Sequence, residues 1–179
     1  MVFVANVGDA KAVLARLPAK QLPTEGVSAD HTAKPGDGIP MEAKKEERPK
    51  AVIVTREHKA IFPEERARVE KAGGFVANGR LQGRLEVSRA FGDRQFKKVG
   101  VSAAPDVHAF KITERERFMV LGCDGFWGVF GPSDAVEFAD KLLQEGLSVE
   151  VVSKRLVREA VRERRCKDNC TALTIVFSR

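Results

Sequence analysis

The chain has 179 residues, a formal net charge of +6, 43% hydrophobic residues and three cysteines. This length and apolar content suit one domain with one substantial core, and no apolar run is long enough to cross a bilayer. An odd cysteine count without framework spacing argues against a disulfide-stapled secreted fold. We therefore expect an intracellular protein, cytoplasmic and/or nuclear, with reduced thiols and no membrane partner.

The first predicted elements are two β-strands, residues 1–7 and 10–17, both rich in Val, Ala and Leu. Gly8-Asp9 interrupts them as a turn would, which predicts a hairpin with Asp9 at its tip. From residue 18 to about 50 the composition shifts to Pro, Gly, Lys and Glu. Such a segment cannot bury enough apolar surface to offset its ordering entropy, so we expect a flexible loop insertion there.

The rest of the chain alternates between strand and helix patterns. Pro63 opens a helix with acidic residues in its first turn, and Gly73-Gly74 ends it. Ser148 is expected to cap the last helix, whose apolar face would include Val161. The other predicted elements are strands at residues 51–55, 75–77, 106–112, 118–123 and 170–177, and a helix from 132 to 146.

Three aspartates stand at the ends of predicted strands. Asp9 lies at the first turn, Asp124 follows a strand apolar enough to be central in a sheet, and Asp168 precedes the last strand. Strand ends can bring distant carboxylates to one site, and hard divalent cations such as Mg²⁺ or Mn²⁺ prefer oxygen ligands. Two such ions, about 3.5–4 Å apart, can activate a water for attack on a phosphate ester. The same spacing also fits turn formers or helix caps.

Six segments, taken in chain order, resemble one known family, the PP2C-type (PPM) metal-dependent protein serine/threonine phosphatases. The resemblance covers nearly the whole chain except the loop after residue 17. The segments are ANVGDAKAVL (5–14), EHK with AGG (57–59 and 72–74), LEVSRAFGD (85–93), APDV (104–107), LGCDGFW (121–127) and KDNCT (167–171).

The resemblance implies an α+β fold, a four-layer α-β-β-α sandwich of two mainly antiparallel sheets flanked by helices. It also implies that Asp124 and Asp168 bind the catalytic Mg²⁺ or Mn²⁺ ions and that Asp9 is associated with an additional, more weakly held metal. No residue of the chain is assigned a direct catalytic role. Gly125 matches a glycine that leaves room beside the metal, and phosphoproteins would be the substrates.

The family's opening segment, with an Asp-Gly-His-Gly motif whose aspartate bridges both metals, has no counterpart in this sequence. We therefore interpret residues 1–179 as a single partial domain, N-terminally truncated, with an incomplete two-metal site and little or no activity by itself. The alternative is a pseudophosphatase or regulatory binding module on the same scaffold. A third interpretation, nucleic-acid binding, rests only on the charge of +6, and we expect no nucleic-acid partner.

Overall fold

The computed structural model describes residues 1–19 and 47–177. The strands are β1 (Val2–Asn6), β2 (Lys11–Arg16), β3 (Lys50–Ile53), β4 (Val76–Ala77), β5 (Arg80–Leu81), β6 (Asp106–Phe110), β7 (Glu116–Gly122) and β8 (Ala172–Val176). The helices are α1 (Pro63–Lys71), α2 (Asp124–Trp127), α3 (Pro132–Gln144) and α4 (Val149–Arg158), with a 3-10 helix η1 (Arg94–Val99) and a π-helical turn η2 (Glu159–Glu163). Most of the predicted strand and helix positions are thereby confirmed, while the loop expected at 18–50 lies largely outside the described residues.

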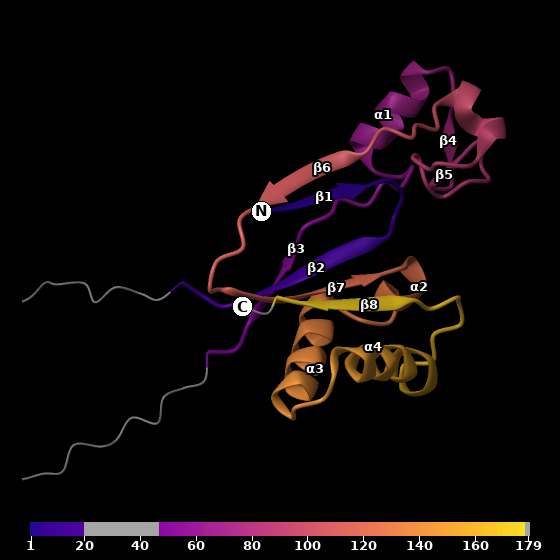
Figure 1. Ribbon diagram of the computed structural model, residues 1–179. Helices are drawn as coiled ribbons and strands as arrows, with labels where there is room; N and C mark the ends of the chain where they lie inside the picture. Colours follow the sequence, from indigo (N-terminus) through magenta and orange to yellow (C-terminus); the bar gives the residue numbers. More distant parts are fainter. Residues whose placement is uncertain (20–46, 178–179) are drawn as a thin grey trace, which may run out of the picture.

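Two antiparallel sheets and a layer of helices are stacked on one another (Figure 1). Strands β3, β2, β7 and β8 form one sheet in that order, and β1 pairs with β6 in another. Helices α3 and α4 cover one face of the four-stranded sheet, and the β1–β6 sheet lies over its other face. The α+β class and the antiparallel sheets are confirmed. The outer face of β1–β6 leaves Phe3 and Val107 exposed, at 71% and 65%.

The hairpin predicted for the first two strands is wrong, because β1 and β2 belong to different sheets. The edges of β2 are occupied by β3 on one side and β7 on the other. Strand β2 is buried on both faces, as expected for a strand between two layers. The turn with Gly8 and Asp9 therefore carries the chain from one sheet to the other.

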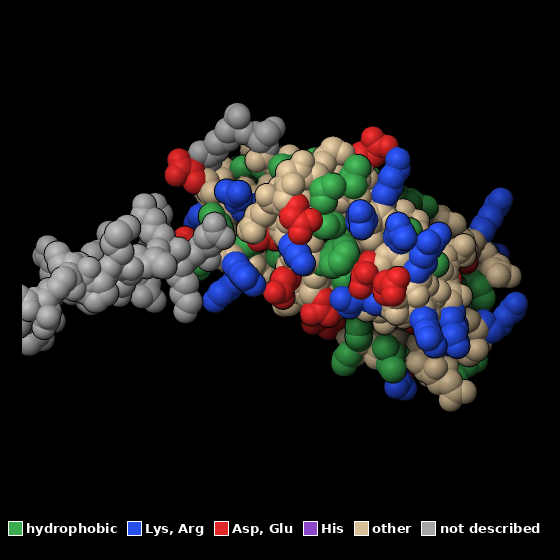
Figure 2. Space-filling model, turned by 90° about the horizontal axis from the view of Figure 1, so that it is seen from below, with side chains coloured by type: hydrophobic (Ala, Val, Ile, Leu, Met, Phe, Trp, Pro, Cys, Tyr) green, Lys and Arg blue, Asp and Glu red, His purple; other side chains and the backbone are tan. Residues whose placement is uncertain are grey.

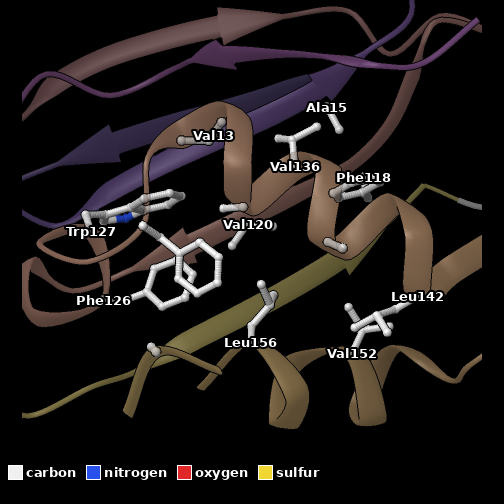
Figure 3. Close-up of a cluster of buried hydrophobic side chains, with 14 residues drawn as sticks. Val13, Ala15, Phe118, Val120, Phe126, Trp127, Val136, Leu142, Val152 and Leu156 are labelled. Carbon is white, nitrogen blue, oxygen red and sulfur yellow. The ribbon is translucent and has the colours of Figure 1, made fainter. Parts of the chain in front are cut away.

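The main core lies between the four-stranded sheet and the helices α3 and α4 (Figure 3). The sheet contributes alternate side chains such as Val13 and Val120, and α4 contributes Leu156. Phe126 makes an edge contact with Trp127, with ring centroids 4.8 Å apart. Since a buried aromatic side chain removes a large area from water, these rings fix the short helix α2 against the end of the sheet.

A second core lies between the two sheets. Ala12 and Leu14 of β2 and Met119 of β7 face it, and Val4 of β1 and Phe110 of β6 pack from the other side. A third cluster holds α1, β4, β5 and η1 together in a lateral unit beside the sheets (Figure 1). The chain enters and leaves this unit next to the turn between β1 and β2. The unit therefore borders the end of the sandwich at which this turn lies.

The helix predicted after Ser148 begins as expected, because the Ser148 hydroxyl accepts a hydrogen bond from the backbone N–H of Val151 at 3.4 Å. Its end differs, because η2 is a π-helical turn. A π turn is wider than an α turn and shifts the register of the side chains. Ala160 is consequently buried, whereas Val161, expected on the apolar face, is 45% exposed.

Charged side chains of both signs are interspersed on the face that Figure 2 shows. On α4, Lys154 pairs with Glu150 at 2.6 Å, and Arg164 lies 3.4 Å from Asp134 of α3. Such mixing is typical of a solvated helix surface. Among the helices of the described residues, none is long and apolar enough to span a membrane.

Candidate functional site

The segments that carry Asp124 and Asp168 lie side by side. Asp124 directly follows β7 at the start of α2, and Asp168 stands in the loop that leads into β8. The backbone N–H of Cys123 donates to the Thr171 carbonyl at 3.2 Å, which extends the β7–β8 pairing past the end of both strands. The antiparallel register therefore brings Asp124 and Asp168, which are far apart in the sequence, to the same end of the paired strands.

Gly125 is the point of closest approach between these two segments. A Cβ atom at this position would lie 2.2 Å from the Asn169 carbonyl oxygen and 3.1 Å from the Cβ of Asp168. Only glycine fits such a contact, which agrees with the expectation that Gly125 leaves room at this place. The two carboxylates are fixed locally as well, since Asp124 and Asp168 accept hydrogen bonds from the backbone N–H groups of Gly125 and Asn169 at 2.8 and 2.7 Å.

Asp9 lies at the same end of the molecule, in the turn between β1 and β2 (Figure 1). Burial and the negative charge of Asp124 both raise the pKa of Asp9 above its usual value. The negative charge of Asp124 therefore reaches Asp9, and a cation bound near both would relieve this repulsion. The three aspartates singled out in the sequence thus come from the ends of separate strands and gather at one end of the sandwich.

The donor chemistry suits a hard divalent cation, because the three side chains offer only oxygen atoms. Asp124 and Asp168 are exposed and Asp9 is half-buried. Within residues 1–19 and 47–177, however, no three His, Cys, Asp or Glu side chains are grouped closely enough to hold a metal ion. The described residues therefore fit part of a cation site, and the remaining ligands would be water, substrate or other protein groups.

Charged side chains of other segments lie near Asp9, among them Lys59. Lys11 lies 3.2 Å from Glu57, and Lys59 lies 3.4 Å from Glu86. The charges of Lys59 and Glu86 both act on Asp9, the former lowering its pKa and the latter raising it. The site is thus a mixed electrostatic environment, in which the aspartates and lysines come from different segments of the chain.

Three thiols surround the contact between the two aspartate segments. The Cys123 thiol donates to the Asn169 carbonyl at 3.2 Å, and the Cys166 thiol donates to the Gly125 carbonyl at 3.1 Å. Burial and then the neighbouring thiols raise the pKa of Cys170 to about 11. All three cysteines are free, as expected. Cys123, within the predicted strand 118–123, stands just after β7 and is half-buried against the main core.

His58 makes structural hydrogen bonds. It is fully buried, and its Nδ1 accepts a hydrogen bond from the backbone N–H of Gly8 at 3.2 Å. Its Nε2 lies 3.2 Å from Oδ2 of Asp106, although off the line of a well-aligned hydrogen bond. Through this ring, the segment after β3 is attached to both the β1–β2 turn and the start of β6.

The buried carboxylate of Glu65 was not singled out in the sequence. Arg89 pairs with it at 2.6 Å, Ser88 donates to it at 2.5 Å and Arg68 at 3.0 Å. Burial alone would raise the pKa of Glu65, but these hydrogen bonds outweigh burial and lower the pKa to about 2. The only feature of the sequence that could have indicated its burial is its position one helical turn before Val69, on the buried face of α1.

Solved structures place this fold in a known class. The crystal structure of a serine-threonine phosphatase 2C from Toxoplasma gondii matches 98% of this chain and 54% of that chain, with a TM-score of 0.72 and 25% sequence identity. A C. elegans sex determining protein shares the fold, with a TM-score of 0.68 over 97% of this chain and 36% of its own. The fold is thus that of a phosphatase 2C sandwich.

The sequence comparisons identify the family. The family model described as Protein phosphatase 2C matches residues 42–170, and the chain belongs to this family. The chain is 64% identical to "Probable protein phosphatase 2C 8" of Arabidopsis thaliana and 61% identical to "Probable protein phosphatase 2C 67" of Oryza sativa subsp. japonica. These matches cover 99% and 98% of this chain, but only 46% and 44% of the relatives. The chain therefore spans less than half the length of these curated relatives.

Proposed function

We propose that this chain contributes the metal-binding part of a protein phosphatase that hydrolyses phosphoserine and phosphothreonine in proteins. The observation that supports it most is the contact between the segments of Asp124 and Asp168, closed by the glycine at position 125. Membership of the protein phosphatase 2C family supports the reaction class and protein substrates. An intracellular location, cytoplasmic or nuclear, is part of the same proposal.

In this proposal Asp124 and Asp168 hold the catalytic cations, Mg²⁺ or Mn²⁺, and Asp9 helps to hold a further ion. When bound, such ions supply Lewis acidity for attack of water on phosphorus and positive charge for the phosphate oxygens. The chain itself orients the carboxylates: backbone N–H groups hold one oxygen each of Asp124 and Asp168. The incomplete ligand set within the described residues implies that further groups complete the site.

A chimera tests the reaction. The matching part of the Arabidopsis thaliana relative would be replaced by this chain, and phosphate release from a phosphothreonine peptide would be measured with and without Mn²⁺. We expect Mn²⁺-dependent release, and at least about a 100-fold loss for Asp124→Asn and Asp168→Asn, because removal of even an outer partner of a metal ligand costs 10–100-fold. Glu137→Gln, on the exposed face of α3, is the control and should leave release unchanged.

The same chimera decides between the enzyme and a pseudophosphatase or regulatory module. Retained folding without Mn²⁺-dependent release would favour the module. Release that persists at full rate in the Asp168→Asn chimera would refute the proposed metal site but leave the phosphatase activity standing.

A further inference from the structure

One buried histidine holds the turn that carries Asp9 at two points. The backbone N–H of Gly8 donates to Nδ1 of His58 at 3.2 Å, and the backbone N–H of His58 donates to the Gly8 carbonyl at 2.9 Å. The Asn6 side chain also donates to that carbonyl, at 3.1 Å. Gly8 has a φ of +107°, which residues with a side chain rarely adopt. These bonds therefore hold the backbone directly before Asp9 in one unusual conformation.

On its other side the ring of His58 faces the carboxylate of Asp106. Because Nδ1 accepts a hydrogen bond, the ring carries its proton on Nε2, which lies 3.2 Å from Oδ2 of Asp106. The second oxygen of Asp106 accepts a hydrogen bond from Arg89 at 2.8 Å, and Arg89 pairs with the buried Glu65 at 2.6 Å. A continuous series of side chains thus runs from α1 in the lateral unit to the turn at Gly8.

We propose that His58 is a positioning residue for Asp9, and that its Nδ1 fixes the Gly8–Asp9 turn in the conformation that presents the Asp9 carboxylate to a divalent cation. The inference rests on the proposed function, because Asp9 needs a fixed position only if it binds a metal. His58 is 0% exposed, so it acts through the backbone and not on a substrate. Partners that orient metal ligands in this way affect metal affinity strongly.

A residue that only filled space would tolerate any side chain of similar size and polarity. Two substitutions of His58 distinguish the roles of its two ring nitrogens. Asparagine places an amide oxygen close to the position of Nδ1, where it can accept a hydrogen bond from the backbone N–H of Gly8. It loses the contact with Asp106. Glutamine places its amide NH₂ close to the position of Nε2, where it can donate a hydrogen bond to Asp106. It loses the hydrogen bond from the backbone N–H of Gly8. Both variants lose a similar amount of buried ring, so their stabilities should be comparable.

The test uses the 179-residue chain and three measurements: the melting temperature, hydrogen exchange of the Gly8 amide followed by NMR, and the Kd for Mn²⁺ by calorimetry. We expect His58→Asn to keep the Gly8 amide protected and to change the Kd by less than about threefold. His58→Gln should lose that protection and weaken Mn²⁺ binding about tenfold or more. Equal protection and equal affinity in the two variants would overturn the proposal.

Two further outcomes have defined meanings. If the wild-type chain binds no Mn²⁺, the two variants are compared in the chimera, where the same difference in Kd is expected; if the chimera binds no Mn²⁺ either, the proposed metal site fails, while the exchange of the Gly8 amide still decides whether His58 fixes the turn. If His58→Gln does not fold, Asn6→Ala is the second variant, because it removes the side-chain hydrogen bond that the Gly8 carbonyl accepts from Asn6. We expect Asn6→Ala to weaken Mn²⁺ binding about threefold or more, and unchanged binding and exchange would refute the positioning of this turn.

Discussion

At the residue scale, the geometry of the candidate site depends on Gly125, which has no side chain. The missing Cβ of Gly125 lets the backbone of α2 touch the Asn169 carbonyl, and this contact sets the separation of Asp124 and Asp168. The thiols of Cys123 and Cys166 donate to carbonyl groups of the same two segments. A small set of backbone contacts therefore determines where the two carboxylates can meet.

Gly125→Ala should separate the two aspartate segments. The new Cβ would lie 2.2 Å from a backbone oxygen, so one segment must move. We expect a loss of about 1–3 kcal/mol in the free energy of unfolding, the usual cost of overpacking, together with at least about tenfold weaker Mn²⁺ binding. Urea denaturation and calorimetry measure the two effects. Gly92→Ala is the matched control, because a Cβ there meets nothing within 4 Å.

An equal loss of stability in both variants, or wild-type affinity for Mn²⁺ in Gly125→Ala, would show that the close contact does not set the site.

At the scale of elements, α1 is attached to the segment after β5 by one buried ionic cluster. Glu65 accepts hydrogen bonds from Ser88, Arg89 and Arg68, and Arg68 also donates to the Gly100 carbonyl at 2.5 Å. A buried carboxylate with several donors stabilises a fold only while every partner is present. The attachment of α1 to the rest of the lateral unit thus depends on one carboxylate.

The contribution of Glu65 should disappear in acid. Its pKa falls from an ordinary 4.5 to about 2 on folding, so the stability it provides is complete above pH 4.5 and is lost as the pH falls towards 2. We expect Glu65→Gln to lose about 3 kcal/mol at pH 7, and the difference from the wild type to shrink between pH 4.5 and 2. Urea denaturation across this pH range checks it.

Glu70→Gln, on the exposed side of the same helix, should change the stability by less than about 0.5 kcal/mol. A stability difference between wild type and Glu65→Gln that stays constant from pH 7 to pH 2 would contradict the assignment.

At the scale of the whole molecule, the described residues form three layers, with the three proposed metal ligands at one end. The outer face of the β1–β6 sheet keeps Phe3 and Val107 exposed. The candidate ligands Asp9, Asp124 and Asp168 gather at one end, but the described residues do not group three donors around one point. An ion held by so few protein ligands would bind weakly.

The 179-residue chain alone should therefore release phosphate at least about 100-fold more slowly than the chimera with the Arabidopsis thaliana relative, since each missing element around a metal costs 10–100-fold. The measurement is phosphate release from a phosphothreonine peptide in the presence of Mn²⁺, with the metal-free reaction as the blank. Turnover of the chain comparable to that of the chimera would contradict this expectation and show that its own residues suffice.

The sequence by itself determined the elements and the chemistry of the donors. Local patterns placed the helix after Pro63, the cap at Ser148 and the apolar strand before Asp124, because these features depend on neighbouring residues. The residue types also indicated oxygen ligands for a hard cation.

Only the tertiary structure decided which elements meet. The first two strands join different sheets, Val161 turns outward at a π-helical turn, and Glu65 finds two of its partners, Ser88 and Arg89, in a segment more than 20 residues away. Asp124 and Asp168 meet because β7 pairs with β8 in antiparallel register, and Asp9 lies at the same end of the sandwich because its turn leads into β2, which pairs with β7. Strand pairing and burial are long-range properties of the packed chain, and no local pattern encodes them.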